Sequence, residues 1–378
     1  MTVNEKINIP DKKAPIVLLA PLDWGLGHAT RSIPLIKHLL SIGCKVIIAS
    51  EGSQQLLLKQ EFTELRFVHL KGYRIKYSKK SWQTIIKIFL QFPKILTAIK
   101  NEKKWIGHFL LENHVDAIIS DNRYGFYDSN IHSVFITHQL MIKSPFGVII
   151  EKFLQKYNYR FIGKFTECWI PDFEGKDNLS GELSHPASLP ATKVKYLGKL
   201  SRITKEPGSK RSIELLIMLS GPEPQRSIFE NILLTQLTTC SISTVLIRGL
   251  PAAEKLPLCH NKKLTVYNHL SATDLNRLIN DSTIIISRSG YSTIMDLIGL
   301  NKKCIFIPTP GQPEQEYLAR YLSSKKLCLS FPQKNFSLQK ALTAIHESTF
   351  NSFNEPVMEK YKDVLEEFVK ELELRVES

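Results

Sequence analysis

Apolar and polar residues alternate in blocks along this chain of 378 residues, with short, uninterrupted apolar runs between longer amphipathic segments. An uninterrupted apolar run is typical of a strand in a parallel sheet that is covered on both faces, and the amphipathic segments have the spacing of helices. The first half predicts strands at 15–21, 45–50, 65–70, 116–121, 133–138 and 167–172, and helices at 29–43, 53–60, 81–113 and 147–163. Pro93 predicts a break or kink within the third of these helices.

The second half repeats this alternation. It predicts strands at 213–220, 243–249, 264–270, 282–290 and 303–310, and helices at 223–237, 271–280, 291–301, from 315 onward and at 355–378. A stretch rich in Gly, Pro, Ser and charge separates the halves. We therefore expect an α/β protein of two doubly wound, Rossmann-like domains that face each other across a cleft, with domains at 1–198 and 212–378 and a linker at 199–211. The last helix, about 356–378, is amphipathic and could pack back on the first domain.

Composition and charge exclude fewer classes of protein than the order of apolar and amphipathic segments does. The six cysteines are scattered without a CxxC pair, which favours reduced thiols over disulfides or zinc. The start of the chain is polar and no stretch is long and apolar enough to span a membrane, so we expect a cytoplasmic protein, with contact to the inner face of a membrane left open.

The formal net charge of +14 has a local source in residues 71–104, which hold ten lysines and arginines and one acid. Because apolar residues alternate with these cations, the segment suits anionic lipid headgroups. A nucleic-acid groove is the rival interpretation, which we do not favour, and a solvated helix face is the plain alternative.

The loop after the first predicted strand, PLDWGLGHATRS at 21–32, holds the first candidate chemistry. Gly25 and Gly27 fit the start of a dinucleotide fingerprint, but Thr30 stands where the third glycine is needed. His28 lies where a helix begins and would face the cleft, where a neutral imidazole can act as a general base. The alternative is that His28 only caps or packs the turn.

Three loops of the second half have the composition of binding sites. The segment 286–296, ISRSGYSTIMD, puts hydroxyl groups at a helix N-terminus, where phosphate binds well, although an ordinary capped helix has the same look. The segment 308–316, PTPGQPEQE, crowds carboxylates and amides that suit sugar hydroxyls. The segment 219–226, LSGPEPQR, follows a strand and ends at Arg226, which could meet a phosphate.

Together these four segments resemble glycosyltransferases of the GT-B fold, and family 28 most of all, with the more specific match at about 212–345. The resemblance implies that the 289–293 loop holds the diphosphate of a nucleotide sugar, UDP by the family's preference, and that Asp296 binds the ribose. It implies that Gln315 contacts the donor sugar and that His28 lies on the acceptor side near the reacting carbon. The expected donor-binding residues are Ser220, Gly221, Arg226, Arg248, Arg288, Ser289, Gly290, Tyr291, Ser292, Thr293, Asp296, Glu314 and Gln315. The expected acceptor-side residues are Gly25, Gly27, Arg31, Arg123 and His138.

The implied reaction is inverting transfer of a hexose or N-acetylhexosamine from a nucleotide sugar to an acceptor hydroxyl, which could be lipid-linked. His28 is the expected base, and Asp121, which follows a predicted strand, is the second catalytic candidate. No metal and no cofactor beyond the donor are expected. The sequence departs from the family at Glu316, which replaces a second glutamine, and at the proline-rich 219–226 loop. A GT-B sugar-nucleotide epimerase and a non-catalytic nucleotide-sugar-binding protein stay open as alternatives.

Overall fold

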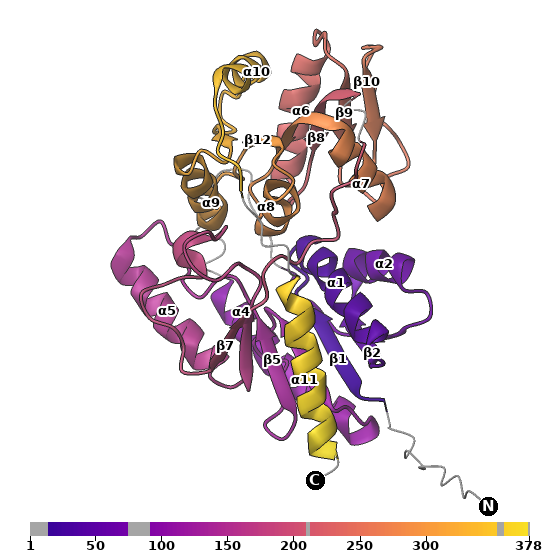
Figure 1. Ribbon diagram of the computed structural model, residues 1–378, viewed down its shortest axis with the longest axis vertical. Helices are drawn as coiled ribbons and strands as arrows, with labels where there is room; N and C mark the ends of the chain where they lie inside the picture. Colours follow the sequence, from indigo (N-terminus) through magenta and orange to yellow (C-terminus); the bar gives the residue numbers. More distant parts are fainter. Residues whose placement is uncertain (1–13, 75–90, 209–211, 354–358, 377–378) are drawn as a thin grey trace, which may run out of the picture.

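The computed structural model describes residues 14–74, 91–208, 212–353 and 359–376, which form two α/β domains stacked along the long axis of the molecule (Figure 1). Each domain is built on one parallel sheet with helices on its faces, so the expected doubly wound, two-domain fold is confirmed. The sequence patterning carried this prediction because the central strands of both sheets, such as β1, β4 and β11, are almost completely buried, whereas the edge strands β3 and β10 are partly exposed.

The N-terminal domain holds a seven-stranded sheet in the order β3-β2-β1-β4-β5-β6-β7. Its central strands β1, β4 and β5 are almost completely buried, as their continuous apolar runs require. Its strands are β1 (Ile16–Pro21), β2 (Lys45–Ser50), β3 (Arg66–His69), β4 (Ala117–Asp121), β5 (His132–Ile136), β6 (Glu167–Ile170) and β7 (Lys193–Tyr196). Its helices are α1 (Gly27–Ser41), α2 (Gly52–Glu61), α4 (Phe92–Glu112), α5 (Val148–Ile162) and the short 3₁₀ turn Gly181–Leu183.

The C-terminal domain holds a six-stranded parallel sheet in the order β10-β9-β8-β11-β12-β13. The strand order reverses next to β8 and β11, and in doubly wound folds a ligand binds at the carboxyl ends of the strands beside such a point. The strands are β8 (Ile213–Met218), β9 (Thr244–Ile247), β10 (Leu264–Tyr267), β11 (Ser282–Ser287), β12 (Lys303–Phe306) and β13 (Leu329–Ser330). The helices are α6 (Gln225–Leu237), α7 (Ala272–Asp281), α8 (Tyr291–Ile298), α9 (Pro313–Ser324) and α10 (Leu338–Glu347).

Pro93 has a different role from the expected one. The residue lies in the first turn of α4, where its missing N–H costs no hydrogen bond, rather than at a kink inside a longer helix. The predicted helix began at residue 81, and residues 75–90 lie outside the described part of the chain. The basic segment 71–104 is therefore described only at its two ends.

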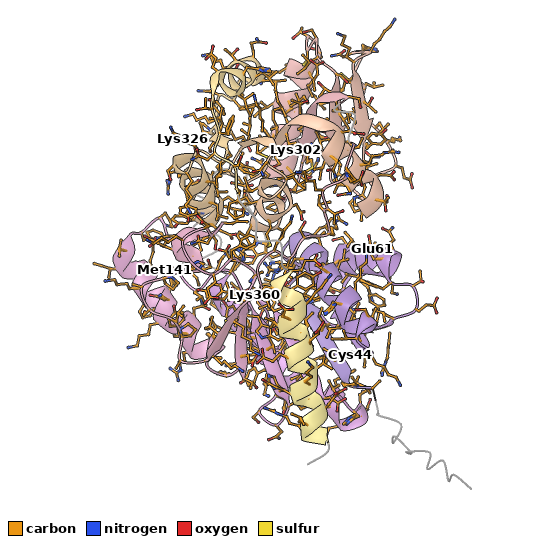
Figure 2. All side chains as sticks on the ribbon, in the orientation of Figure 1. Cys44, Glu61, Met141, Lys302, Lys326 and Lys360 are labelled. Atoms are coloured by element: carbon orange, nitrogen blue, oxygen red, sulfur yellow. The ribbon has the colours of Figure 1, made fainter. Side chains whose placement is uncertain are left out.

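The last helix, α11 (Lys360–Val376), leaves the C-terminal domain and packs along the N-terminal domain, against α1 and β7 (Figure 1). Phe368 of α11 packs edge-on against the buried Trp169 of β6, with the ring centroids 5.1 Å apart. Lys360 begins the helix at the level of the junction between the domains (Figure 2). The chain thus crosses between the domains twice, once in the linker and once before α11.

Two further sequence expectations concern the whole chain. All six cysteines are free, four of them buried, as the absence of a paired spacing suggested. Among the helices of the described ranges, none is long and apolar enough to cross a membrane.

Candidate active site

The glycine-rich loop of the first domain meets the hydroxyl-rich loop of the second at the junction between them. Gly27 begins α1, and its carbonyl oxygen accepts a hydrogen bond of 3.1 Å from the Ser292 hydroxyl in the first turn of α8. A side chain at Gly27 would press on Ser292, since a Cβ built there would lie 2.8 Å from the hydroxyl oxygen. The two predicted halves of the site are therefore in direct contact across the junction.

His28, Arg31 and Asp121 form one buried network on the N-terminal side. Asp121 ends β4, and its Oδ2 accepts a hydrogen bond of 2.7 Å from Arg31 Nε, while its Oδ1 pairs with the same guanidinium. His28 Nδ1 lies 3.0 Å from Asp121 Oδ1 and 2.8 Å from Arg31 Nη2. This arrangement unites the expected base, the second catalytic candidate and one acceptor-side residue.

The contacts at Nδ1 of His28 are compatible with two tautomers of its imidazole. Nδ1 can donate to Asp121 only when it carries the ring proton, and Nε2 then keeps its lone pair; in the other tautomer, Nδ1 accepts from Arg31. Nε2 has no hydrogen-bond partner within the described ranges, and the side chain keeps 13% of its surface exposed. Burial lowers the pKa of His28, and the Arg31 cation adds to this against the opposing pull of Asp121. The ring is neutral at pH 7, as a general base must be.

The network continues across the junction through His138, which follows β5. Arg31 Nη1 lies 3.3 Å from His138 Nδ1, and His138 Nε2 lies 2.8 Å from Glu314 Oε1 at the start of α9. Gln139 donates to the other carboxylate oxygen of Glu314. The His138 ring also stacks on Tyr291 of α8, with centroids 4.2 Å apart. The expected acceptor-side His138 thus joins two expected donor-side residues.

The N-terminus of α8 holds the loop for which the sequence predicts phosphate binding. Gly290 precedes the helix in an extended conformation, and a Cβ built there would meet nothing within 4 Å, so the backbone faces open space. Ser289 is fully buried and donates to the Gln315 carbonyl at 2.8 Å, which fixes this loop against α9. Ser292 and Thr293 follow in the first turn. Free amides and hydroxyls at a helix N-terminus are suited to a diphosphate.

Asp296 lies one turn further along α8 and already has a hydrogen-bond donor. The Ser201 hydroxyl, in the linker between the domains, donates to Asp296 Oδ1. Burial raises the pKa of Asp296 to about 6, although this hydrogen bond and nearby cations oppose the shift. A hydroxyl on this carboxylate is the contact that a ribose would make.

The expected phosphate-binding arginines of the second domain are held by internal partners. Arg226 pairs with Glu223 at 2.6 Å and with Glu230 at 3.1 Å, and Arg248 pairs with Glu230 and donates to Asn268 at 2.7 Å. This cluster lies beside the loop of Ser220 and Gly221, both of which are exposed. Ser220 and Gly221 are therefore accessible to a ligand, whereas the guanidinium groups stabilise the loop from behind.

Two more predicted arginines lie inside their domains. Arg288 is 1% exposed and donates to the carbonyls of Ile307 and Gln225, at 3.1 Å and 2.9 Å, and burial lowers its pKa to about 9. Arg123 is fully buried, donates to the Pro21 carbonyl at 2.9 Å and pairs with Glu102 at 2.8 Å. These side chains hold strand ends together and do not reach the junction.

Gln315 and Glu314 have opposite orientations, although they are neighbours. The Gln315 amide oxygen accepts from the Thr309 backbone N–H at 2.9 Å, so the side chain braces its own loop. Glu314 instead reaches His138, and despite its burial the pKa of Glu314 is lowered, because His138, His28 and Arg31 lie close by. Of the two, Glu314 is the one that faces the other domain.

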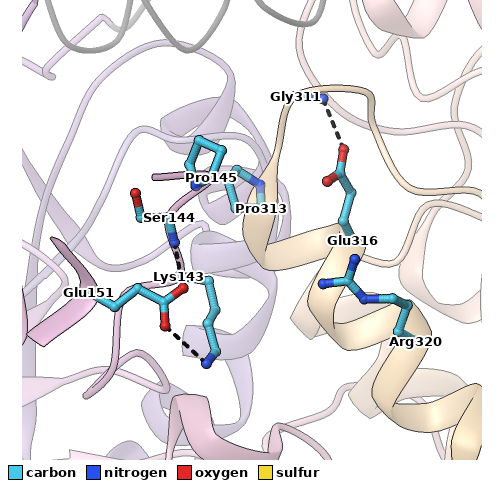
Figure 3. Close-up of a pocket in the computed structure, with 8 residues that line it drawn as sticks. All are labelled: Lys143, Ser144, Pro145, Glu151, Gly311, Pro313, Glu316 and Arg320. Carbon is cyan, nitrogen blue, oxygen red and sulfur yellow. Dashed lines mark hydrogen bonds and ion pairs between the residues drawn. The ribbon is translucent and has the colours of Figure 1, made fainter. Parts of the chain in front are cut away.

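Two cavities flank this central network. One, of about 210 Å³, lies between the loop before α5 and the start of α9, with the Lys143 ammonium and the Glu151 carboxylate on one wall and Glu316 and Arg320 on the other (Figure 3). The other, of about 160 Å³, lies beside the glycine-rich loop and is lined by Leu22, Asp23, Trp24, Gly25, Tyr73, Arg74 and Pro222. One of these pockets thus adjoins the glycine-rich loop of the first domain, and the other lies between α5 and α9.

Sequence reasoning missed four residues of this region: Trp24, Tyr73, Glu102 and Ser201. Trp24 carried a usable signal, because a tryptophan inside a glycine-rich polar loop has no core to join. The other three gave none, since their partners lie far away in sequence. Tyr73, for example, donates its hydroxyl proton to Glu102 at 2.8 Å, 29 residues on.

One group of described side chains has ligand atoms close enough to hold a metal ion. His132, Glu167 and Glu371 place one such atom each within 4.8 Å of the others. Lys193 and Lys195 already neutralise Glu167, with Nζ 3.0 Å and 3.3 Å from Oε1. His132 begins β5 and therefore lies at the end of the sheet opposite to the junction. This cluster is an ion-pair network that joins α11 to the sheet, remote from the candidate active site.

Among the comparisons with known proteins, a family model matches a stretch of the chain that lies mostly in the second domain. Residues 234–372 match the glycosyltransferase family 28 C-terminal domain. The UDP-N-acetylglucosamine--N-acetylmuramyl-(pentapeptide) pyrophosphoryl-undecaprenol N-acetylglucosamine transferase of Sulfurihydrogenibium sp. (strain YO3AOP1) is 28% identical over 153 residues. That match covers 39% of this chain and 42% of the relative, so it spans less than half of the relative's length.

Two longer matches cover both domains. An uncharacterized glycosyltransferase of Methanosarcina acetivorans is 24% identical over 314 residues, which is 77% of this chain and 79% of the relative. The crystal structure of the glycotransferase of kitacinnamycin superposes with a TM-score of 0.60 and 13% identity, covering 95% of this chain and 96% of that one. At this identity the structural match shows the shared fold.

Proposed function

We propose that this chain, a GT-B glycosyltransferase of the family 28 type, transfers a hexose or N-acetylhexosamine from a UDP-sugar to an acceptor hydroxyl with inversion. The observation that carries the proposal is the meeting of the His28 network with the N-terminus of α8, joined by the Ser292–Gly27 hydrogen bond. One side offers a neutral imidazole and the other offers amides for a leaving diphosphate. A UDP donor is supported by the name of the family 28 relative, which is a UDP-N-acetylglucosamine-dependent transferase.

The reaction is a direct displacement at the anomeric carbon. His28 Nε2 takes the proton of the acceptor hydroxyl, whose oxygen forms a bond to the anomeric carbon as the bond to the diphosphate oxygen breaks. The electron pair of that bond leaves with UDP, and the amides of the 289–293 loop stabilise the growing negative charge. Attack from the face opposite to the diphosphate inverts the configuration.

Asp121 and Arg31 serve this step through His28. In the tautomer that donates Nδ1–H to Asp121, Nε2 keeps its lone pair for the acceptor proton, and the carboxylate stabilises the imidazolium that forms. Arg31 keeps Asp121 ionised, since Arg31 and His28 hold the pKa of this carboxyl well below its usual range even though burial opposes them. Asp121 is thus a positioning residue in this mechanism rather than the base.

The test compares two histidine variants, His28→Ala and His108→Ala, the second an exposed control on α4. Binding of UDP is measured by calorimetry, and release of UDP from UDP-glucose and UDP-N-acetylglucosamine is followed with water as acceptor. We expect both variants to bind UDP like the wild type, with hydrolysis lowered by about 100-fold or more only in His28→Ala. Unchanged hydrolysis in His28→Ala would contradict the mechanism, and wild-type protein that binds no UDP would contradict the donor assignment.

Product analysis in the same experiment separates the remaining alternatives. An epimerase would convert the UDP-sugar into its epimer, and a non-catalytic binding protein would bind UDP and leave the donor intact. A transferase releases the sugar, so recovery of free sugar and UDP in equal amounts supports the proposal.

We further propose a lipid-linked acceptor at an anionic membrane surface. The family 28 relative acts, by its name, on a pyrophosphoryl-undecaprenol substrate. In this chain the support comes from α5 and the loop before it, where six apolar side chains are 38% to 84% exposed: Phe146, Val148, Ile149, Ile150, Phe153 and Tyr157. Lys152, Lys156 and Arg160 are exposed on the same helix. An apolar face bordered by cations suits insertion among anionic headgroups.

The sequence predicted the membrane contact in residues 71–104, and only part of this segment can be compared with the structure. Residues 75–90 lie outside the described part of the chain, and the C-terminal part of α4 turns Ile106 and its neighbours into the core of the first domain. Flotation with anionic vesicles tests the α5 face directly. We expect the Ile149→Ser/Phe153→Ser double variant to float less than the wild type, and equal flotation of the two would contradict the role of α5.

A further inference from the structure

Trp24 is an exposed aromatic side chain at the edge of the candidate active site. It retains 43% of its surface accessible and lines the 160 Å³ cavity beside the glycine-rich loop. Pro222, from the other domain, lines the same cavity. A tryptophan that stays half exposed contributes little of the stabilisation that burial of its large apolar surface would give. An exposed tryptophan inside a pocket therefore indicates a ligand-binding surface.

The backbone that presents Trp24 is fixed on both sides. The Gln54 side-chain amide donates to the Leu22 carbonyl and, at 2.7 Å, to the Gly25 carbonyl, so one group holds the residues that bracket Trp24. The Asp23 carboxylate accepts from the backbone N–H groups of Tyr73 and Arg74, at 2.7 Å and 2.9 Å. The loop is therefore pinned to both α2 and the segment after β3. An aromatic face held in this way binds a ring without first losing conformational entropy.

The position of this face relative to the reacting centre is set by the chain. Trp24 lies four residues before His28, and Gly27 between them touches the donor loop through Ser292. A ring resting on Trp24 therefore lies on the acceptor side of the proposed base. The other walls are polar as well as apolar, since Asp23 and Arg74 line the cavity with Tyr73 and Pro222.

We propose that Trp24 is the stacking platform for a pyranose ring of the acceptor, so that the acceptor is itself a glycoside. This inference rests on the proposed transfer reaction and adds the residue that recognises the acceptor. The C–H face of a pyranose packs on the apolar indole, while its hydroxyls reach the polar groups of the rim; a flat aromatic aglycone would leave those groups without partners. Trp24 would act on binding of the acceptor and not on the donor.

The buried network beneath the cavity supports this assignment. Arg123 Nη1 pairs with Glu102 and also donates to the Lys71 carbonyl at 3.3 Å, and Arg123 Nε donates to the Pro21 carbonyl. It therefore joins the chain just before the Trp24 loop to the chain just before Tyr73. Arg123 was predicted as an acceptor-side residue. In this arrangement it acts through the two chain segments that line the pocket, which it holds in position.

The experiment uses the full chain saturated with UDP and three probes: methyl β-D-glucopyranoside, methyl N-acetyl-β-D-glucosaminide and glycerol. Binding is followed by saturation-transfer NMR in the wild type, Trp24→Phe and Trp24→Ala, and the affinity for UDP is measured for each. We expect the ring C–H protons of at least one glycoside to receive saturation in the wild type and in Trp24→Phe. We expect the signal to fall about tenfold in Trp24→Ala, to be absent for glycerol throughout, and the UDP affinity to stay the same.

Three results would overturn the proposal: no saturation transfer to either glycoside in the wild type, an equal signal in Trp24→Ala, or a UDP affinity that falls with loss of the indole. The last result would assign Trp24 to the nucleotide base instead. Failure of the transferase proposal gives a different pattern, because the wild-type protein would then either bind no UDP or bind it without releasing free sugar from the UDP-sugar. Since Trp24 is a half-exposed loop residue, both variants should keep the wild-type melting temperature, which checks that they fold.

Discussion

Replacing Asp296 by asparagine should stabilise the protein and weaken its binding of nucleotide. Asp296 lies in α8 with a hydroxyl of Ser201 on its carboxylate, and burial raises its pKa to about 6 from an ordinary 3.8. The raised pKa means that folding disfavours the ionised form. Asparagine keeps an oxygen that can accept from Ser201 and carries no charge, so the cost of burying a carboxylate is removed.

The size and the pH dependence of this effect follow from the shift. A pKa moved from 3.8 to about 6 corresponds to about 3 kcal/mol of folding free energy, an upper bound because the side chain is only partly buried. Well below the ordinary pKa of 3.8, the carboxyl is protonated in both the folded and unfolded states and costs nothing. The cost then grows as the pH rises, and it is complete above pH 6. The gain from Asp296→Asn should therefore be small near pH 4 and largest at pH 7.

Urea denaturation of the wild type and Asp296→Asn at several pH values between about 4.5 and 7.5 measures this gain. Asp177→Asn, at an exposed loop position, is the matched control and should give no pH-dependent difference. Calorimetry with UDP should show weaker binding by Asp296→Asn, by about 5- to 30-fold, if the carboxylate binds the ribose. A stability difference that does not change with pH, or a variant less stable than the wild type at pH 7, would refute the reasoning.

Two further predictions concern the first domain. Asp121→Asn leaves the buried Arg31 without its charge partner and should lower the free energy of unfolding by about 3 kcal/mol at pH 7. Because the pKa of Asp121 is held low, the difference in unfolding free energy between wild type and variant should begin to shrink as the pH falls below about 4. Urea denaturation at pH 7 and pH 3 that gives the same difference would disprove this. Gly72→Ala would push a Cβ into the Asp23 carboxylate and should lower the melting temperature. Gly107→Ala, in open space on α4, should raise the melting temperature slightly. Thermal denaturation that ranks the two variants the other way would contradict the role of Asp23 in holding the segment after β3.

The sequence was sufficient to predict most of the architecture. Uninterrupted apolar runs such as those of β1, β4 and β11 demand a parallel sheet with both faces covered, whatever the partners are. The same order of elements places the loops after the strands at one edge of each sheet. His28 and Ser292 could therefore be assigned to opposite walls of one site before any contact was known.

The role of each charged residue could not be predicted in this way. The sequence predicted Arg288 as a donor-binding residue and Arg123 as an acceptor-side residue, because both follow strands that end at the expected cleft. In the structure both donate to backbone carbonyls inside their domains, and Arg123 also pairs with Glu102. The two carbonyls that accept from Arg288 lie 19 and 63 residues away. A buried guanidinium must satisfy its donors wherever the fold supplies acceptors, and local patterning does not specify those acceptors.

What the sequence determined by itself is therefore the set of elements, their order and the edge at which the site lies, because these depend on periodicity and on the chirality of the chain. Only the tertiary structure decided which side chains face that site. It joined His28 to Asp121, covered Asp296 with Ser201 and left Trp24 exposed beside Pro222 of the other domain. These outcomes depend on distances between residues far apart in the chain, and such distances are fixed only when both sheets and the crossing helix α11 are packed together.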